Sequence, residues 1–441
     1  MIDYMEVILY NVSVRLLLKG SASVKIFGST DILLPKSASM HRWAVIACDQ
    51  FTSDNAYWQR VAETVGDAHS TLHMILPEAH LGAADEAAIV KNINKTMEEY
   101  LENDVFEVYK KSYIYVERTL LNGTVRPGLI GAVDLEEYDY NPGSVSAVRA
   151  TEKTVLERIP PRQRVRKDAS IEFPHVLMLA DDDKKQLIEP IAAIKDRLFK
   201  IYDFDLMEGG GHITGWVVRG EDAAAFDERL AAYIEAVPAK YADLNGAPVT
   251  LAVGDGNHSL ATAKACWEEL KPTLSEAERE THPARYALIE LTNLHDDSLE
   301  FEAIHRVLFE VDGEKLLNDY IAAYPGAHLG EGEGHQVTYI LNGKKGVVTV
   351  PNPTAQLEVG TLQAFLDQYL KENGGKIDYI HGEDVTEELA SQPNSIGFIL
   401  PCMDKDQLFP TVIFDGALPR KTFSMGEAHD KRFYLEARKI K

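Results

Sequence analysis

An apolar run that leads directly into a polar, glycine-containing turn constrains the fold of this chain more than any other stretch. The residues "PVTLAV", 248–253, form a near-continuous apolar segment, which is typical of a strand covered on both faces. The turn "GDGNHS", 254–259, follows, and residues 259–270 have the periodicity of a helix. A buried strand that ends in a turn and opens a helix predicts a mixed α/β fold.

Helices and strands alternate along most of the remaining chain. Helices are expected at 54–66, 83–103, 185–199, 223–236, 361–373 and 383–391. Strands are expected at 112–120, 127–135, 175–180, 284–294, 301–309, 377–380 and 395–401, with two more within 201–218 and a hairpin turned at Asn342-Gly343. The first 24 residues are expected to form an N-terminal extension. A boundary near Asp312 then separates a main α/β domain (25–311) from a smaller C-terminal α/β lobe (312–441).

The segment 149–168 begins with a helical pattern that Pro160 and Pro161 interrupt. Proline lacks the backbone donor and its ring clashes with the preceding turn. The basic residues after the two prolines are therefore expected in a loop.

Charge and cysteine content exclude several classes of protein. The formal charge is -24 and the pI is near 5.0, so nucleic acid and anionic membranes are disfavoured as partners unless a local basic patch overcomes the global field. Cys48, Cys266 and Cys402 stand far apart without a CxxC pair, which fits neither a disulfide framework nor a cysteine zinc site and indicates a cytoplasmic protein. The first 20 residues are interrupted by charges and match neither a signal peptide nor a membrane anchor.

The turn has the features of an anion-binding site. A strand that ends in glycines and opens a helix points unpaired backbone N–H groups at one spot, where the helix dipole adds a partial positive charge. Gly254 and Gly256 let the backbone approach a phosphate closely, and Asn257 or Ser259 caps the helix or donates to the ligand. The alternative is an ordinary Gly-Asp-Gly connection with no ligand. The turn is neither a Walker A loop nor a three-glycine dinucleotide motif.

Two further groups of charged residues are candidates for ligand binding, one for phosphate and one for magnesium. A basic segment would clamp a phosphate through guanidinium forks; its members are Arg158, Arg162, Arg164, Arg166 and Lys167. Its alternative is a solvent-facing loop that balances nearby acids. The acidic run that follows a predicted strand would hold magnesium, with Asp181 as the first candidate ligand, or would be a turn and helix start; its members are Asp181, Asp182 and Asp183.

Several motifs together resemble one bacterial family, catalogued as Domain of Unknown Function 1015. They are "DILLPK", "WAVIACDQFTS", "VGDAHSTLHMILPE", "FPHVLMLADD", "AVGDGNHSLATAKA", "YALIELTNL", "EAIHRVLF", "YIHGED" and "LPRKTFSMGEA". The resemblance spans residues from about Lys25 to the C-terminus. The family's usual central motif, Asp-Gly-His-His-Arg, is similar to the phosphate-binding turn of ParB, sulfiredoxin and ParB-like free serine kinases, which implies a ParB/sulfiredoxin-like core.

Carried over residue by residue, the resemblance assigns positions 255–259 to that motif. Asn257 stands where sulfiredoxin has its reactive cysteine, so sulfinic-acid reduction is not supported. Ser259 replaces the terminal arginine of the motif, and Arg164, Arg166 or Lys421 would have to supply the missing phosphate contact.

These observations favour an enzyme that binds a nucleotide or phosphorylated small molecule at 254–259 and transfers phosphate to a small polar metabolite. Asp255 would be a magnesium ligand or general base and His258 a phosphate contact or proton carrier. ATP or ADP with Mg²⁺ is the expected cofactor, and no haem, flavin, zinc or iron–sulfur cluster is expected. The oligomeric state is not predicted, and a homo-oligomer is one of the alternatives. The alternative from another class is a nucleotide-gated, ParB-like DNA-binding or regulatory protein without turnover; a scaffold is the third.

Overall fold

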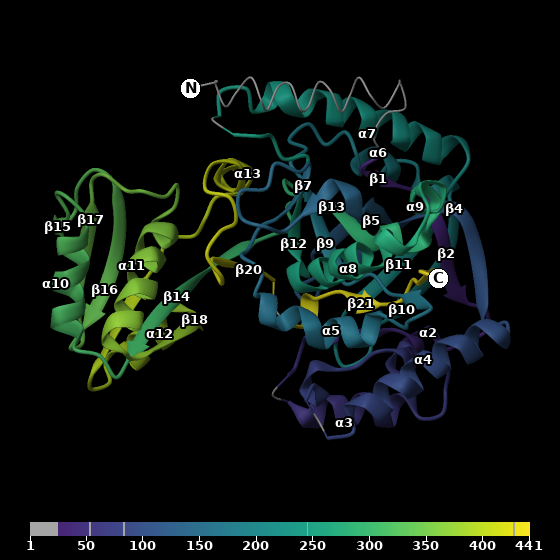
Figure 1. The fold of residues 1–441 in the computed structure, drawn as a ribbon, viewed down its shortest axis with the longest axis horizontal. Coiled ribbons are helices and arrows are strands. Elements are labelled where there is room, and N and C mark those ends of the chain that lie inside the picture. Colours follow the sequence, from purple (N-terminus) through teal and green to yellow (C-terminus); the bar gives the residue numbers. More distant parts are fainter. Residues whose placement is uncertain (1–24, 53, 83, 245, 427) are drawn as a thin grey trace.

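The chain folds into two lobes, each built on one β-sheet (Figure 1). The computed structural model describes residues 25–52, 54–82, 84–244, 246–426 and 428–441. Helices and sheets occur together in both lobes, so the predicted mixed α/β class is confirmed. The predicted N-terminal extension, 1–24, lies outside the described residues.

The first lobe contains an eleven-stranded mixed sheet with the path β10-β11-β4-β5-β13-β9-β12-β7-β6, to which β1 and β2 add at β5 and β4. Its strands are β1 (Phe27–Gly28), β2 (Thr30–Pro35), β4 (Phe106–Thr119), β5 (Val125–Asp134), β6 (Tyr138–Asp139), β7 (Val148–Ala150), β9 (Val176–Ala180), β10 (Phe199–Asp205), β11 (His212–Val218), β12 (Leu251–Asp255) and β13 (Tyr286–Asn293). The predicted neighbours β4 and β5 pair antiparallel, from Ile114 opposite Ile130 to Thr119 opposite Val125.

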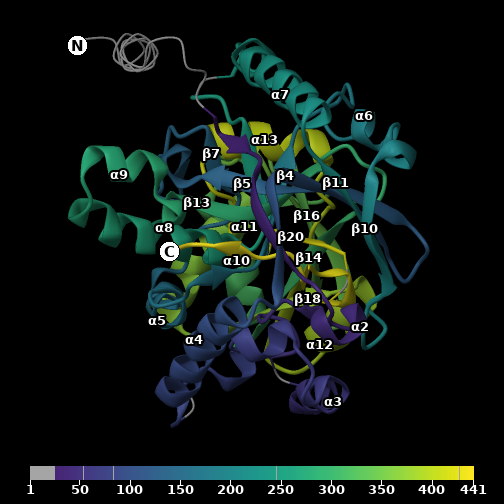
Figure 2. The ribbon, with the colours of Figure 1, turned by 90° about the vertical axis from the view of Figure 1, so that its right-hand side faces the viewer.

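Helices cover both faces of this sheet, with α7 on one side and α3 and α4 on the other (Figures 1 and 2). The helices of the first lobe are α2 (Met40–Trp43), α3 (Asn55–Val65), α4 (Glu86–Glu102), α5 (Ile159–Arg166), α6 (Glu189–Ala192), α7 (Glu221–Lys240), α8 (Asn257–Leu270) and α9 (Glu276–Thr281). Because strand side chains alternate between faces, Tyr113 and Tyr115 of β4 join the core under α7 and α8, whereas Ile114 and Val116 join the core with α3 and α4. β9 and β12 are also covered on both faces: Met178 and Val253 join the core under α7 and α8, whereas Leu179 and Ala252 join the core of the second lobe, which explains why both strands are so apolar.

The second lobe contains a seven-stranded sheet with the path β15-β17-β16-β19-β14-β18, to which β20 adds at β14. Its strands are β14 (Phe301–Phe309), β15 (His328–Leu329), β16 (His335–Leu341), β17 (Lys344–Val350), β18 (Lys376–His381), β19 (Ser395–Ile399) and β20 (Phe423–Met425). Its helices are α10 (Gly313–Ala323), α11 (Glu358–Asn373) and α12 (Glu383–Ala390), and α13 (Lys405–Phe414) lies between the lobes in Figure 1. β16 and β17 form the predicted hairpin at Asn342-Gly343.

The end of the chain returns to the first lobe. β21 (Phe433–Tyr434) pairs with β3 (Val45–Ile46), and β22 (Arg438–Lys439) pairs with β8 (Ile171–Glu172). The buried Trp43 indole donates to the Leu435 carbonyl at 2.8 Å. β14 thus lies before the division predicted at residue 312 yet pairs within the second sheet, while the last strands lie after it yet pair within the first lobe.

Ionised side chains are buried where the chain end meets the first sheet. Arg432, on the last segment, donates to Glu290 of β13 at 2.8 Å and forms an ion pair with Glu436. These three side chains are at most 5% exposed, and Tyr202 donates a hydrogen bond to Glu436. Burial lowers the pKa of Arg432, but Glu436 and Glu290 outweigh burial and raise it. We call Arg432, Glu290 and Glu436 the buried charge cluster.

For residues 149–168, the predicted order of a helix followed by a loop is wrong. The helix does not end at Pro160 and Pro161; α5 begins at Ile159, and the prolines occupy its first turn. A missing N–H is tolerated there, because the first N–H groups of a helix have no partner within it. The arginines that follow are therefore on a helix and not in a loop.

The helix predicted at 185–199 is also wrong. Only Glu189–Ala192 is α-helical, and β10 begins at Phe199. Lys185 has a φ of 52°, which cannot start a right-handed helix, and Pro190 can only stand in a first turn. The segment is consequently limited to a short α-helix around Pro190 and a 3-10 turn at Lys195–Arg197.

Candidate functional site

A polar cleft of about 1100 Å³ lies where the two lobes meet. Its walls come from the β12–α8 turn, from α5, from the loop after β3, from β14 and β18 of the second lobe, and from the segment around β20. All six residues of the predicted turn line it: Gly254, Asp255, Gly256, Asn257, His258 and Ser259. The structure therefore brings the predicted turn to a cleft between the lobes.

The turn is shaped by Gly256, which caps α8 with a φ of +82°. A Cβ at this position would lie 3.0 Å from the Cα of Val176 and 3.2 Å from the carbonyl oxygen of His175. Only glycine adopts this conformation readily at such a close approach. The glycine thus lets the start of α8 pack directly against the start of β9.

The first turn of α8 presents unpaired polar groups. The helix has no side-chain cap, and its first internal bond runs from the Leu260 N–H to the Gly256 carbonyl, so the N–H groups of residues 257–259 are free of backbone acceptors. The Asn257 side chain is only 8% exposed, and its Oδ1 has no hydrogen-bond partner in the described chain. The Ser259 hydroxyl likewise has no bonded partner in the part of the chain that the structure describes.

Asp255 is held from two sides. Its Oδ1 accepts from the Gly256 N–H at 2.9 Å, and its Oδ2 lies 3.1 Å from the ammonium of Lys431. Lys431 is in the segment that leads to β21. The carboxylate is therefore oriented and charge-balanced by a lysine that the sequence prediction did not include.

His258 is kept neutral by its surroundings. Burial lowers its pKa, the guanidinium groups of Arg162 and Arg158 lower it further, and the result is about 4. Nε2 accepts the Val155 N–H at 3.3 Å, so the proton of the neutral ring is on Nδ1. His258 thus has one N–H to donate to a ligand and is a poor candidate for a resident positive charge.

The low pKa of His258 predicts a pH-dependent stability. The pKa of His258 is about 4 in the folded protein, below the reference pKa of 6.5. The contribution of the neutral ring to the free energy of unfolding is therefore complete above pH 6.5 and is lost as the pH falls from 6.5 toward 4. Between pH 7 and pH 5 the parent should lose about 1 kcal/mol more free energy of unfolding than His258→Gln, a figure reduced for a half-buried ring. Urea unfolding at both pH values measures this difference. His80→Gln, an exposed change, should behave as the parent.

The predicted arginines are divided between the cleft and its surroundings. Arg164 lines the cleft and bonds Glu86 at 2.8 Å, and Arg162 is paired with Glu78. Arg166 does not line the cleft, since it points away and bonds Glu172 at 2.5 Å. Its predicted role as a phosphate contact in the cleft is not supported: it lies one turn beyond Arg162 on the same face of α5, but its guanidinium is bound by the buried Glu172 carboxylate outside the cleft.

Two cations of the cleft have no carboxylate partner among the described residues. Arg158 precedes α5, and Lys421 comes from the segment before β20; both line the cleft, and both are exposed. Lys421, predicted to compensate for the missing arginine of the motif, lines the same cleft as the turn. Arg158 belongs to the predicted basic segment.

Asp181 does not share a site with Asp255. β9 runs antiparallel to β12, so the residue after β9 lies at the opposite end of these strands from the turn. Asp181 bonds His295 at 2.5 Å and Lys240 at 2.9 Å. Both bonds engage the Asp181 carboxylate, so its predicted role as a magnesium ligand is not supported, and across the ranges that the structure describes no three His, Cys, Asp or Glu residues are grouped as a metal site.

Asp49 and His175 are cleft residues that the sequence prediction missed. The His175 Nε2 lies 3.2 Å from an Asp49 carboxylate oxygen, and its Nδ1 lies 2.6 Å from the Tyr434 hydroxyl. Burial lowers the pKa of His175, but Asp49 outweighs burial and raises it well above the ordinary value, so the two form an ion pair. Both residues lie in motifs that carry the family resemblance, "WAVIACDQFTS" and "FPHVLMLADD", which was the available signal.

No helix in the described ranges combines the length and the apolar composition that a membrane crossing requires.

Comparisons with known proteins agree with the family resemblance. A family model described as Protein of unknown function (DUF1015) matches residues 30–369. No curated protein matches the chain. Among solved structures, the chain is similar to a variant of a free serine kinase in complex with ADP, at 10% identity over 69% of this chain and 90% of that one, with a TM-score of 0.38. It is also similar to a conserved hypothetical protein from Pyrococcus furiosus (12% identity, 70% and 94% covered, TM-score 0.35) and to C-terminally truncated SbnI from Staphylococcus aureus (10%, 67% and 82%, 0.36).

Proposed function

The chain belongs to the family described as Protein of unknown function (DUF1015), and on this premise we propose that its cleft binds the phosphate of a nucleotide or another phosphorylated small molecule. The phosphate would lie at the first turn of α8. The proposal rests on the chemistry of the cleft, because the family description assigns no activity.

The buried amide of Asn257 is the observation that carries the proposal. Buried polar atoms are almost always hydrogen-bonded, yet Oδ1 of this side chain has no partner in the described chain. Rotation of the amide exchanges the oxygen for the NH₂ group, which can donate to an anion. The side chain stands beside the free N–H groups of residues 257–259 and lines the cleft, so a single phosphate would satisfy all of these groups.

Charge in the cleft supports the same ligand. Arg162, Arg164 and Lys431 are neutralised by carboxylates, whereas Arg158 and Lys421 lack such partners among the described residues. A phosphate on the α8 N-terminus would be approached by these two cations from different walls of the cleft. Guanidinium and ammonium groups both bind phosphate well.

The reaction that we propose is phosphoryl transfer to a small polar metabolite, with ATP or ADP as donor. An acceptor hydroxyl attacks the terminal phosphorus, the bond from phosphorus to the bridging oxygen of the nucleotide breaks, and Asp255 takes the hydroxyl proton. The Nδ1–H of His258 and the N–H groups of α8 would stabilise charge on the phosphoryl oxygens. Asp255 supplies one carboxylate, so Mg²⁺ would enter with the nucleotide phosphates and balance their charge.

Thermal-shift measurements test the proposal. Nucleoside di- and triphosphates, with and without Mg²⁺, should raise the melting temperature, since a ligand at 100 times its Kd stabilises by about 2.7 kcal/mol. Asp255→Ala and His258→Ala should reduce the shift, whereas Asp168→Ala, an exposed change outside the cleft, should not. The proposal fails if no phosphorylated compound shifts the parent or if both cleft variants shift equally with it. A shift without turnover of any acceptor would instead favour the ParB-like regulatory function.

A further inference from the structure

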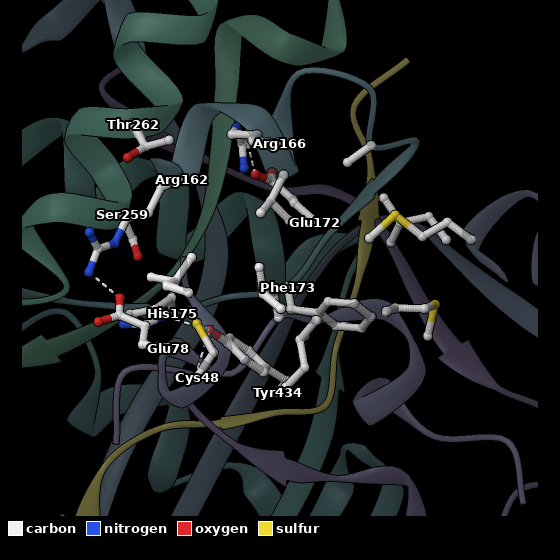
Figure 3. A pocket seen from close by; sticks show the side chains of 18 residues that line it. Cys48, Glu78, Arg162, Arg166, Glu172, Phe173, His175, Ser259, Thr262 and Tyr434 are labelled. Atoms are coloured by element: carbon white, nitrogen blue, oxygen red, sulfur yellow. Dashed lines mark hydrogen bonds and ion pairs between the residues drawn. The ribbon is translucent and has the colours of Figure 1, made fainter. Parts of the chain in front are cut away.

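We propose that the ligand of the cleft carries a compact apolar group, and that this group enters a second pocket beside Ser259. The inference deepens the proposed function and rests on it for the position of the phosphate. The pocket measures about 160 Å³ and lies between α5, the start of α8 and the last segment of the chain (Figure 3).

The pocket wall is largely apolar. Phe173 and Tyr434 contribute their rings, with centroids 5.8 Å apart, and Val165 of α5, Ala169 and the methionine and leucine side chains of the 74–81 segment also line the wall. An apolar cavity of comparable size, about 150 Å³, admits a benzene ring. The pocket therefore suits a phenyl-sized or branched aliphatic group.

Polar side chains of the wall are already bonded to one another. Figure 3 shows Arg162 paired with Glu78 and Arg166 paired with Glu172. The Thr262 hydroxyl donates to the His258 carbonyl at 2.7 Å, and the Tyr434 hydroxyl lies 3.1 Å from the Cys48 sulfur. Ser259, at the edge shared with the cleft, is the exception; beyond it the polar edge of a sugar or nucleobase would meet side chains that are already paired, and burying it unpaired is unfavourable. The wall thus selects for an apolar group.

Ser259 joins the pocket to the phosphate site. It is in the first turn of α8, where its N–H is free, and it lines both the pocket and the cleft. Glu78, Leu81, Arg162 and His175 also line both. Because the two spaces share this edge, one small molecule can place an anionic group at the helix start and an adjacent apolar group in the pocket.

Calorimetric titration with simple phosphate esters tests the inference. Phenyl phosphate should bind about tenfold or more tightly than methyl phosphate, because burial of a ring adds apolar contact. Glycerol phosphate, which adds size without apolar surface, should bind no better than methyl phosphate. Val165→Phe, which fills the pocket from α5, should abolish the preference for phenyl phosphate and preserve the affinity for methyl phosphate; Ala169→Leu is a second filling variant.

The outcomes separate this inference from the proposed function. Equal binding of phenyl and methyl phosphate by the parent, or an undiminished preference in both filled variants, overturns the pocket while the phosphate site stands. If no phosphate ester binds, the proposed function fails, and phenol tests the pocket without a phosphate. Phenol should then raise the melting temperature of the parent and not of Val165→Phe, and the absence of that difference overturns the pocket as well.

Discussion

Arg432→Leu is expected to lower the free energy of unfolding by about 3–5 kcal/mol, the largest effect of any single change considered. Arg432 is 5% exposed and is bonded to Glu290 and Glu436, which are themselves almost fully buried. Removal of the guanidinium leaves Glu436 without an ion-pair partner among the described residues and leaves Glu290 with only Arg126, whose Nε lies 3.8 Å away, in a medium of low dielectric constant. The loss comes from these uncompensated charges and not from the lost attraction alone.

Urea unfolding followed by tryptophan fluorescence is the suitable measurement. All four tryptophans, Trp43, Trp58, Trp216 and Trp267, are in the cores of the first lobe, so the signal reports on the lobe that contains the buried charge cluster. Arg197→Leu is a matched control, because it removes a 65% exposed arginine from an ion pair with Asp222 and should change stability by about 0–1 kcal/mol. A loss below about 1 kcal/mol in Arg432→Leu would contradict the argument.

Asn257→Asp is expected to weaken phosphate binding about 100-fold or more, equivalent to about 2.7 kcal/mol. The substitution preserves the shape of the side chain but replaces a group that can donate to an anion with a carboxylate that repels it. A negative charge at a helix N-terminus is itself favourable, which offsets part of the cost of burying the new carboxylate. The stability of the variant is therefore measured beside its affinity, so that a loss of binding by folded protein is attributed to the ligand contact.

Calorimetric titration with methyl phosphate or ADP gives the affinity, and urea unfolding gives the stability. Asn92→Asp makes the same change of one charge on the exposed surface of α4 and should leave the affinity unchanged. Undiminished binding by Asn257→Asp would show that the buried amide does not face the ligand.

Local signals were sufficient for the strand–turn–helix unit. The apolar run, the two glycines and the helical periodicity each predict one segment, and they correspond to β12 and α8 as observed. The Asp54 cap was predictable for the same reason, and its side chain accepts the Tyr57 N–H. In these segments, the residues that determine the structure are neighbours in the sequence.

Pro160 and Pro161 show where local signals were insufficient. A proline pair can follow a helix or occupy its first turn, and the sequence around it permits both. The packing of α5 against α8 decides the question, and that contact joins residues far apart in the chain.

The site could be predicted only in part for the same reason. The turn residues are contiguous, so they were found together. Asp181 was included because it follows a strand, but the antiparallel direction of β9 relative to β12 places it at the far end. Asp49, His175 and Lys431 reach the cleft through pairings between distant segments, which periodicity and motif spacing do not reveal.

The return of the chain end to the first lobe has a consequence for biosynthesis. β3 pairs with β21, and the indole of Trp43 donates to a carbonyl 392 residues further along the chain. Neither contact can form until that later part of the chain has been synthesised. The ribosome must therefore deliver residues up to 435 before the first lobe can close, although that lobe begins to be made first. Until then its strand edge is unpaired and Trp43 lacks its bonded carbonyl, a state that favours aggregation of a nascent chain.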